Sequence, residues 1–242
     1  MARTYRALDS DKVIETIGVL RHRIVERFPG AGLGEVCAEL LLLAGENSAR
    51  AEKIASRNMP LRVAIFVLLA AGVAALAWIV RLFTSFPTAV DNVFSVLQGV
   101  DAGANLIVLT GAGVFFLTRI EERLKRRAAL KALHELRSIV HVIDMHQLTK
   151  DPTTAVIVGG KTLSSPARTL TPYELSRYLD YCSEMMSLTS KVAVLFAQSL
   201  PDPVVTEAVS DIERIASGMS QKIWQKIIIL EALGPEKEGN RQ

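Results

Sequence analysis

The stretch that decides the fold is AGANLIVLTGAGVFFLT, residues 102–118, which continues directly into RIEERLKRRAALKALHELRSIVHVIDMHQLT, residues 119–149. The first part carries no charge, and neither proline nor glycine occurs between Val114 and Thr149. One continuous helix over 102–149 would be roughly 70 Å long at 1.5 Å per residue. Because a hydrocarbon core is only about 30 Å thick, we expect the first part to span a membrane and the second part to extend beyond it.

A second apolar stretch lies upstream, between Val63 and Val80 (VAIFVLLAAGVAALAWIV). Trp78 suits the membrane–water interface at its far end, where Arg81 can extend toward the headgroups. The two stretches predict a transmembrane hairpin over residues 61–118, with a short extracytoplasmic connector over 82–101.

Basic residues set the expected orientation. They cluster before the first span and after the second, whereas the connector has only Arg81 at its edge. The positive-inside rule then places both termini in the cytoplasm, which predicts a multi-pass protein of the inner (plasma) membrane. Four of the basic residues are also candidates for binding anionic lipid headgroups: Arg123, Lys125, Arg126 and Arg127.

Apolar residues recur at three- and four-residue steps in four further segments, which is typical of amphipathic helices. Residues 1–60 predict a cytoplasmic helical hairpin, with Ser10 or Asp11 as the first cap. Residues 119–236 predict a cytoplasmic bundle, with a capping box at Thr171 and Glu174; residues 237–242 predict a disordered tail. The expected fold is therefore all-α: a two-span transmembrane hairpin, a cytoplasmic antiparallel helical bundle, and a second span continuous with a long cytoplasmic helix.

Three of the four histidines fall within residues 134–146. On a helix, His134 and His141 lie two turns apart, too far to share a metal easily, so we favour a polar seam against a neighbouring helix. We expect His141 to contact the segment 177–181, with Asp180 or Tyr181 as its hydrogen-bond partner. A metal- or proton-binding membrane enzyme or sensor is the alternative, with the metal unknown. The full candidate set is His134, His141, Asp144, His146, Asp180, Tyr181 and Glu184.

The second span also carries polar residues, and small residues lie on both spans. Such residues favour close helix packing, and lining a pore is the sharper interpretation. The candidate pore-lining residues are Asp101, Asn105 and Thr110.

The sequence contains no Ser–His–carboxylate order, zinc signature or nucleotide-binding motif, so we predict no catalytic residue and no cofactor. A net charge of +3 is too small to indicate nucleic-acid binding, and the two cysteines are expected to be buried thiols. We expect a non-enzymatic homo-oligomer with a cytoplasmic scaffold or regulatory domain. An oligomeric cation channel lined by the second span is the main alternative. The expected partners are membrane lipids and a second copy of the chain; a cytoplasmic protein partner is left open.

Overall fold

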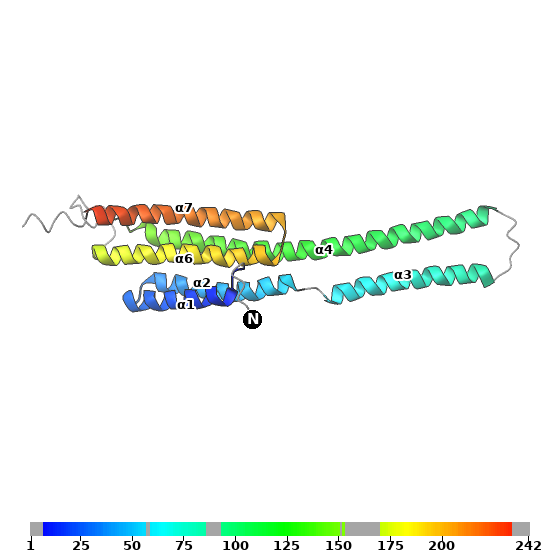
Figure 1. The fold of residues 1–242 in the computed structure, drawn as a ribbon, viewed down its shortest axis with the longest axis horizontal. Coiled ribbons are helices and arrows are strands. Elements are labelled where there is room, and N and C mark those ends of the chain that lie inside the picture. The colour runs from blue at the N-terminus through cyan, green and yellow to red at the C-terminus, as the bar shows by residue number, and fades with distance from the viewer. Residues whose placement is uncertain (1–6, 57–58, 86–92, 151, 153–169, 234–242) are drawn as a thin grey trace, which may run out of the picture. The chain divides into compact units, whose positions relative to one another are not determined.

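The computed structural model describes residues 7–56, 59–85, 93–150, 152 and 170–233. Its helices, in chain order, are α1 (Ser10–Arg27), α2 (Gly32–Ala55), α3 (Met59–Ser85), α4 (Val93–Leu148), α6 (Pro172–Ser199) and α7 (Pro203–Leu233) (Figure 1). No strand occurs in this part of the chain, and the all-α prediction is confirmed. The tail expected over 237–242, together with residues 151 and 153–169, lies outside the described residues.

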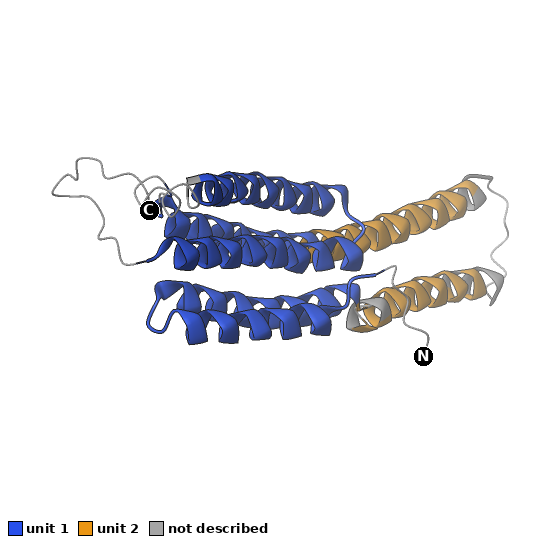
Figure 2. Ribbon diagram, turned by 60° about the vertical axis from the view of Figure 1, so that its left-hand side comes forward, with its two compact units in different colours: residues 1–55, 126–242 blue, residues 56–125 orange. Residues whose placement is uncertain are grey.

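The chain forms two compact units (Figure 2). Unit 1 comprises residues 1–55 and 126–242, and unit 2 comprises residues 56–125. Helix α4 is continuous, with its earlier half in unit 2 and its later half in unit 1.

Unit 1 is a helical bundle around one apolar core. Helices α1 and α2 form a hairpin that packs on α6, and α6 packs on α7. The stripes expected from helical periodicity supply this core: Ile17 and Ile24 on α1, Leu136 on α4, and Leu179 on α6 are fully buried. These side chains leave water only when the helices pack together, so burial of the stripes holds the bundle together.

Local side-chain chemistry sets where two of these helices begin. Thr171 and Glu174 form the expected capping box: the Thr171 amide donates to the Glu174 carboxylate at 2.8 Å, and the Glu174 amide donates to the Thr171 hydroxyl at 3.2 Å. The cap of α1 is Asp9 rather than Ser10 or Asp11, and its carboxylate accepts from two backbone amides. Gly30, at φ 76°, permits the tight turn between α1 and α2.

Unit 2 consists of α3 and the earlier half of α4. Its apolar side chains are exposed, as at Phe66, Trp78 and Leu109. The two helices meet through small residues: a Cβ built on Gly72 would lie 3.4 Å from the Thr110 hydroxyl, and one on Gly113 would lie 3.7 Å from Leu68. Among the described residues, α4 is the one helix long and apolar enough to cross a membrane, whereas the apolar run of α3, Val63–Trp78, is shorter.

Helix α3 continues to Ser85 and α4 begins at Val93, so both helices extend into the connector expected over 82–101. The long helix therefore starts before Ala102, where we expected it to begin. Between Val93 and Ala102, only Gly99 weakens a helix, and a single interior glycine costs about 1 kcal/mol without ending it. Residues 86–92 lie outside the described part of the chain.

Candidate functional site

The expected polar seam on α4 faces solvent. His134 and His141 are both exposed, and Ser138 donates to the His134 carbonyl within the helix. The predicted hydrogen bond from His141 to Asp180 or Tyr181 is wrong. The buried face of α4 is set by its apolar residues, and that helix phase turns His141 outward. That face includes Leu133, Leu136, Val140 and Ile143.

The α6 members of the candidate set have partners on their own helix and on α1 instead. Glu184 accepts two hydrogen bonds from the Arg23 guanidinium, at 2.8 and 3.1 Å. The same guanidinium carbon lies 5.1 Å from the centre of the Tyr181 ring. Asp180 pairs with Arg177 one turn earlier on α6. Glu184 and Tyr181 therefore help to hold α1 against α6, whereas Asp180 has a partner on its own helix.

Asp144 belongs to a polar chain between α4 and α7. Its carboxylate accepts from the Gln147 side-chain amide at 2.6 Å. Gln147 is buried, and its backbone carbonyl accepts from the Lys226 ammonium at 3.0 Å. This set of hydrogen bonds gives partners to polar groups that the bundle would otherwise bury without them.

The described residues do not bring three His, Cys, Asp or Glu side chains together in a way that could hold a metal ion. Cys37 and Cys182 are both buried free thiols, as expected. Burial raises the pKa of Cys37 to about 11 and also raises the pKa of Cys182. Because the thiolate is the reactive form, both thiols are unreactive near neutral pH.

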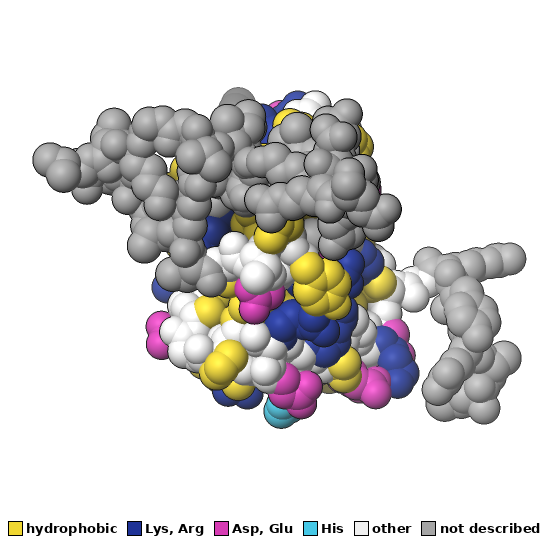
Figure 3. Space-filling model, turned by 90° about the vertical axis from the view of Figure 1, so that its left-hand side faces the viewer, with side chains coloured by type: hydrophobic (Ala, Val, Ile, Leu, Met, Phe, Trp, Pro, Cys, Tyr) yellow, Lys and Arg dark blue, Asp and Glu magenta, His cyan; other side chains and the backbone are white. Residues whose placement is uncertain are grey.

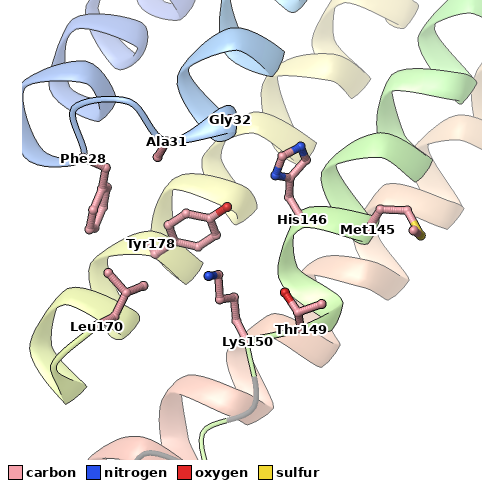
Figure 4. Close-up of a pocket in the computed structure, with 9 residues that line it drawn as sticks. All are labelled: Phe28, Ala31, Gly32, Met145, His146, Thr149, Lys150, Leu170 and Tyr178. Carbon is pink, nitrogen blue, oxygen red and sulfur yellow. The ribbon is translucent and has the colours of Figure 1, made fainter. Parts of the chain in front are cut away.

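His146 differs from the other candidates because it lines a pocket of about 380 Å³ in unit 1 (Figure 4). Three segments that are distant in sequence form the pocket: the α1–α2 turn, the end of α4 and the start of α6. Figure 4 shows the His146 imidazole turned toward Gly32 and the Lys150 side chain turned toward Tyr178. The lining residues are Phe28, Ala31, Gly32, Met145, His146, Thr149, Lys150, Leu170 and Tyr178.

Aromatic and basic side chains are in contact at this pocket. The rings of Phe28 and Tyr178 meet edge to face, with 5.5 Å between their centres. The Lys150 ammonium lies 5.3 Å from the centre of the Tyr178 ring. At this end of unit 1, Figure 3 shows Lys and Arg side chains beside hydrophobic ones. Burial raises the pKa of the Tyr178 phenol, so its hydroxyl stays protonated and can donate a hydrogen bond.

Sequence reasoning identified His146 but missed Lys150, Phe28 and Tyr178. The turn after α1, the end of α4 and the Thr171 cap all lie at helix ends. An antiparallel bundle brings such ends together, and this was the signal that could have identified the pocket.

The three candidate pore-lining residues do not form one group on unit 2. The Asn105 side-chain amide donates to the Asp101 carboxylate at 3.3 Å, one turn away. Thr110 instead lies against Gly72 of α3. Only Asp101 and Asn105 therefore form a local polar group on the exposed surface of α4.

The four basic residues expected to bind lipid headgroups also differ in their contacts. Lys125 pairs with Glu121 at 3.0 Å, and the Arg126 guanidinium binds the Asp202 carboxylate at 2.6 Å. Arg123 and Arg127 are exposed, and neither has an ion-pair partner among the described residues. Half of the expected headgroup set is therefore engaged in contacts within the protein.

Comparison with known proteins gives no assignment for this chain: no family model, no curated protein and no solved structure matches it.

Proposed function

We propose that the chain is a two-span, homo-oligomeric membrane protein whose cytoplasmic helical bundle is a scaffold or regulatory domain. The observation that carries this proposal is the exposed apolar surface of unit 2. Phe66, Trp78 and Leu109 are each about 70% exposed or more, whereas water-soluble proteins rarely expose large contiguous apolar patches. Lipid is the solvent in which such a surface is stable.

Helix α4 is long and apolar enough for a span, and α3 has the length for one although its apolar run, Val63–Trp78, is shorter. Helix α3 has 27 residues, or about 40 Å at 1.5 Å per residue, against a hydrocarbon core of about 30 Å. The basic residues near both ends of unit 2 support cytoplasmic termini. The exposed guanidinium groups of Arg123 and Arg127 are the better candidates for lipid headgroups, because Lys125 and Arg126 already have protein partners.

A small residue of α4 that does not contact α3 supports self-association. Gly72 and Gly113 serve the contact between α3 and α4, whereas Gly111 has no atom within 4 Å of where a Cβ would stand. Val108 and Phe115, one turn away on either side of Gly111, are exposed. Close helix approach at small residues is a common basis of association in membranes.

The test is light scattering on the purified full chain in mild detergent, combined with disulfide cross-linking in native membranes. A Gly111→Cys variant should form a cross-linked dimer, whereas Leu109→Cys, on the opposite side of α4, should not. Cys37 and Cys182 are buried and give little background. A clean monomer in light scattering together with no cross-link at either position would contradict self-association.

The second candidate is an oligomeric cation channel, favoured by the Asp101–Asn105 pair in the mainly apolar earlier half of α4. In this arrangement a ring of Asp101 carboxylates would attract cations at the outer mouth. Reconstituted vesicles should then show cation flux that falls sharply in Asp101→Asn. Absence of flux in the wild-type protein would leave the scaffold as the function.

A further inference from the structure

We propose that the pocket at the α1–α2 turn binds a small organic anion, in which a phosphate or carboxylate is attached to a flat apolar group. This proposal goes beyond the function above and does not depend on it. The pocket volume, about 380 Å³, falls in the range typical of small-molecule sites.

The polar side of the pocket suits an anion. Lys150 and His146 line it, and the lining residues in the described part of the chain include no carboxylate. Apart from the ring of Tyr178, the Lys150 ammonium has no partner among the described residues. The same holds for the His146 imidazole, which forms no hydrogen bond within that part of the chain. A cation and a ring N–H without protein partners provide charge-assisted donors for a phosphate or carboxylate.

The apolar lining residues of the pocket suit a flat apolar group. Phe28 and Tyr178 present their rings at the wall, and Leu170 adds aliphatic surface, whereas the Met145 side chain is directed away from these residues (Figure 4). Aromatic rings prefer offset or edge-to-face contacts with other rings, which favours a planar ligand body. A bare inorganic anion would leave this apolar surface unused.

Gly32 permits the position of His146. A Cβ added at Gly32 would lie 2.9 Å from the His146 Cε1 atom and 3.8 Å from each ring nitrogen. An alanine at this position would therefore push the imidazole out of its place beside the pocket. Because φ at Gly32 is not positive, alanine fits the backbone there. The substitution separates displacement of His146 from loss of the fold.

The experiment measures binding of phenyl phosphate to the full chain in mild detergent by saturation-transfer NMR, with protein-free micelles as the blank. Inorganic phosphate and phenol, the two halves of this probe, are titrated in parallel. We expect saturable binding of phenyl phosphate, and binding of each half about tenfold weaker or more. Lys150→Met should weaken the binding of phenyl phosphate at least about tenfold, because a hydrogen bond to a charged group is lost.

The matched pair of glycine variants tests the geometry. Gly32→Ala should weaken the binding of phenyl phosphate severalfold, whereas Gly45→Ala, on the same helix with open space around it, should leave binding unchanged. Circular dichroism checks that each variant is folded. Phenol binding as tight as that of phenyl phosphate would overturn the proposal, as would unchanged affinity in folded Lys150→Met. Absence of saturable binding up to about 10 mM probe, an affinity worth less than about 3 kcal/mol, would also overturn it.

Discussion

Leu109 and Leu136 lie on the same helix, α4, but in different units and in opposite surroundings. Leu136 is fully buried in the core of unit 1, whereas Leu109 is 70% exposed on unit 2. In unit 1, apolar stripes alternate with charged faces, and packing removes the stripes from water. In unit 2, apolar residues surround the helix, and packing one helix on another leaves most of them uncovered. Periodicity, more than hydrophobicity, therefore separates the helices that bury their apolar faces from those that expose them.

The largest expected effect is on the free energy of unfolding. It tests whether Leu136 and Leu109 contribute to this quantity as differently as their exposure indicates. Leu136→Ala leaves a cavity in a closed core and should lower the free energy of unfolding by about 2–5 kcal/mol. For a unit of this size the melting temperature should fall by roughly 4–20 °C. Leu109→Ala should change it very little. Thermal melts in mild detergent, followed by circular dichroism, measure both variants, and equal losses would contradict the assignment of Leu136 to a core and Leu109 to a lipid-facing surface.

The next largest effect is expected from a charge placed on α4, either in unit 2 or in unit 1. Leu109→Arg puts a guanidinium in the apolar part of α4, where it should disfavour membrane insertion by about 2.5–3.5 kcal/mol. Leu148→Arg puts the same group at the exposed end of α4 in unit 1, where it should be tolerated. Carbonate extraction of membranes measures the inserted fraction. If both variants remained fully inserted, the exposed surface of unit 2 would not face lipid.

The same contrast explains what the sequence could predict. Helix positions followed from apolar spacing and caps, as at Thr171, because both signals are local. The orientation of His141 did not follow. The apolar stripe of α4 is the buried face, and periodicity alone does not tell whether the polar face beside it meets another helix or solvent. The pocket also could not be predicted, because Phe28, His146 and Tyr178 become neighbours through the packing of separate helices.

A smaller effect is expected at Asp202, which lies in unit 1 and binds Arg126. Its carboxylate accepts from the Val204 and Val205 amides at 3.0 and 3.2 Å, so it caps α7. Asp202→Ala should lower the free energy of unfolding by about 1–2 kcal/mol at neutral pH, because a cap is lost. Asp202→Asn keeps a cap acceptor but removes the charge, so its loss should be smaller.

The two variants should also differ in pH dependence. Burial alone would raise the pKa of Asp202, but hydrogen bonds from Arg126 and the two amides hold that pKa below its usual value. A carboxylate with a lowered folded-state pKa stabilises above its unfolded pKa of about 3.9 and loses that contribution as the pH falls through the folded value. The advantage of wild type over Asp202→Asn should therefore shrink below about pH 4. Chemical denaturation at pH 7 and at pH 3 measures this, and a constant difference would contradict it.

The smallest effect concerns the Arg23–Glu184 pair, which joins α1 to α6 at the surface of unit 1. Both side chains are more than a third exposed, at 44% and 40%, so water screens their attraction. The geometry is favourable, because two parallel hydrogen bonds join the groups and the guanidinium also rests on the Tyr181 ring. A double-mutant cycle of Arg23→Ala and Glu184→Ala should give a coupling energy of about 0.2–1 kcal/mol that falls as salt is added. Urea denaturation at low and at high salt measures the coupling.

Replacing Arg23 also removes its contact with the Tyr181 ring, but the cycle cancels that contribution, since it is lost in both the single and the double variant. A coupling above about 2 kcal/mol, or one insensitive to salt, would mean that unit 1 depends on its ion pairs as well as on its apolar core, and the contrast between Leu136 and Leu109 would then explain only part of its stability.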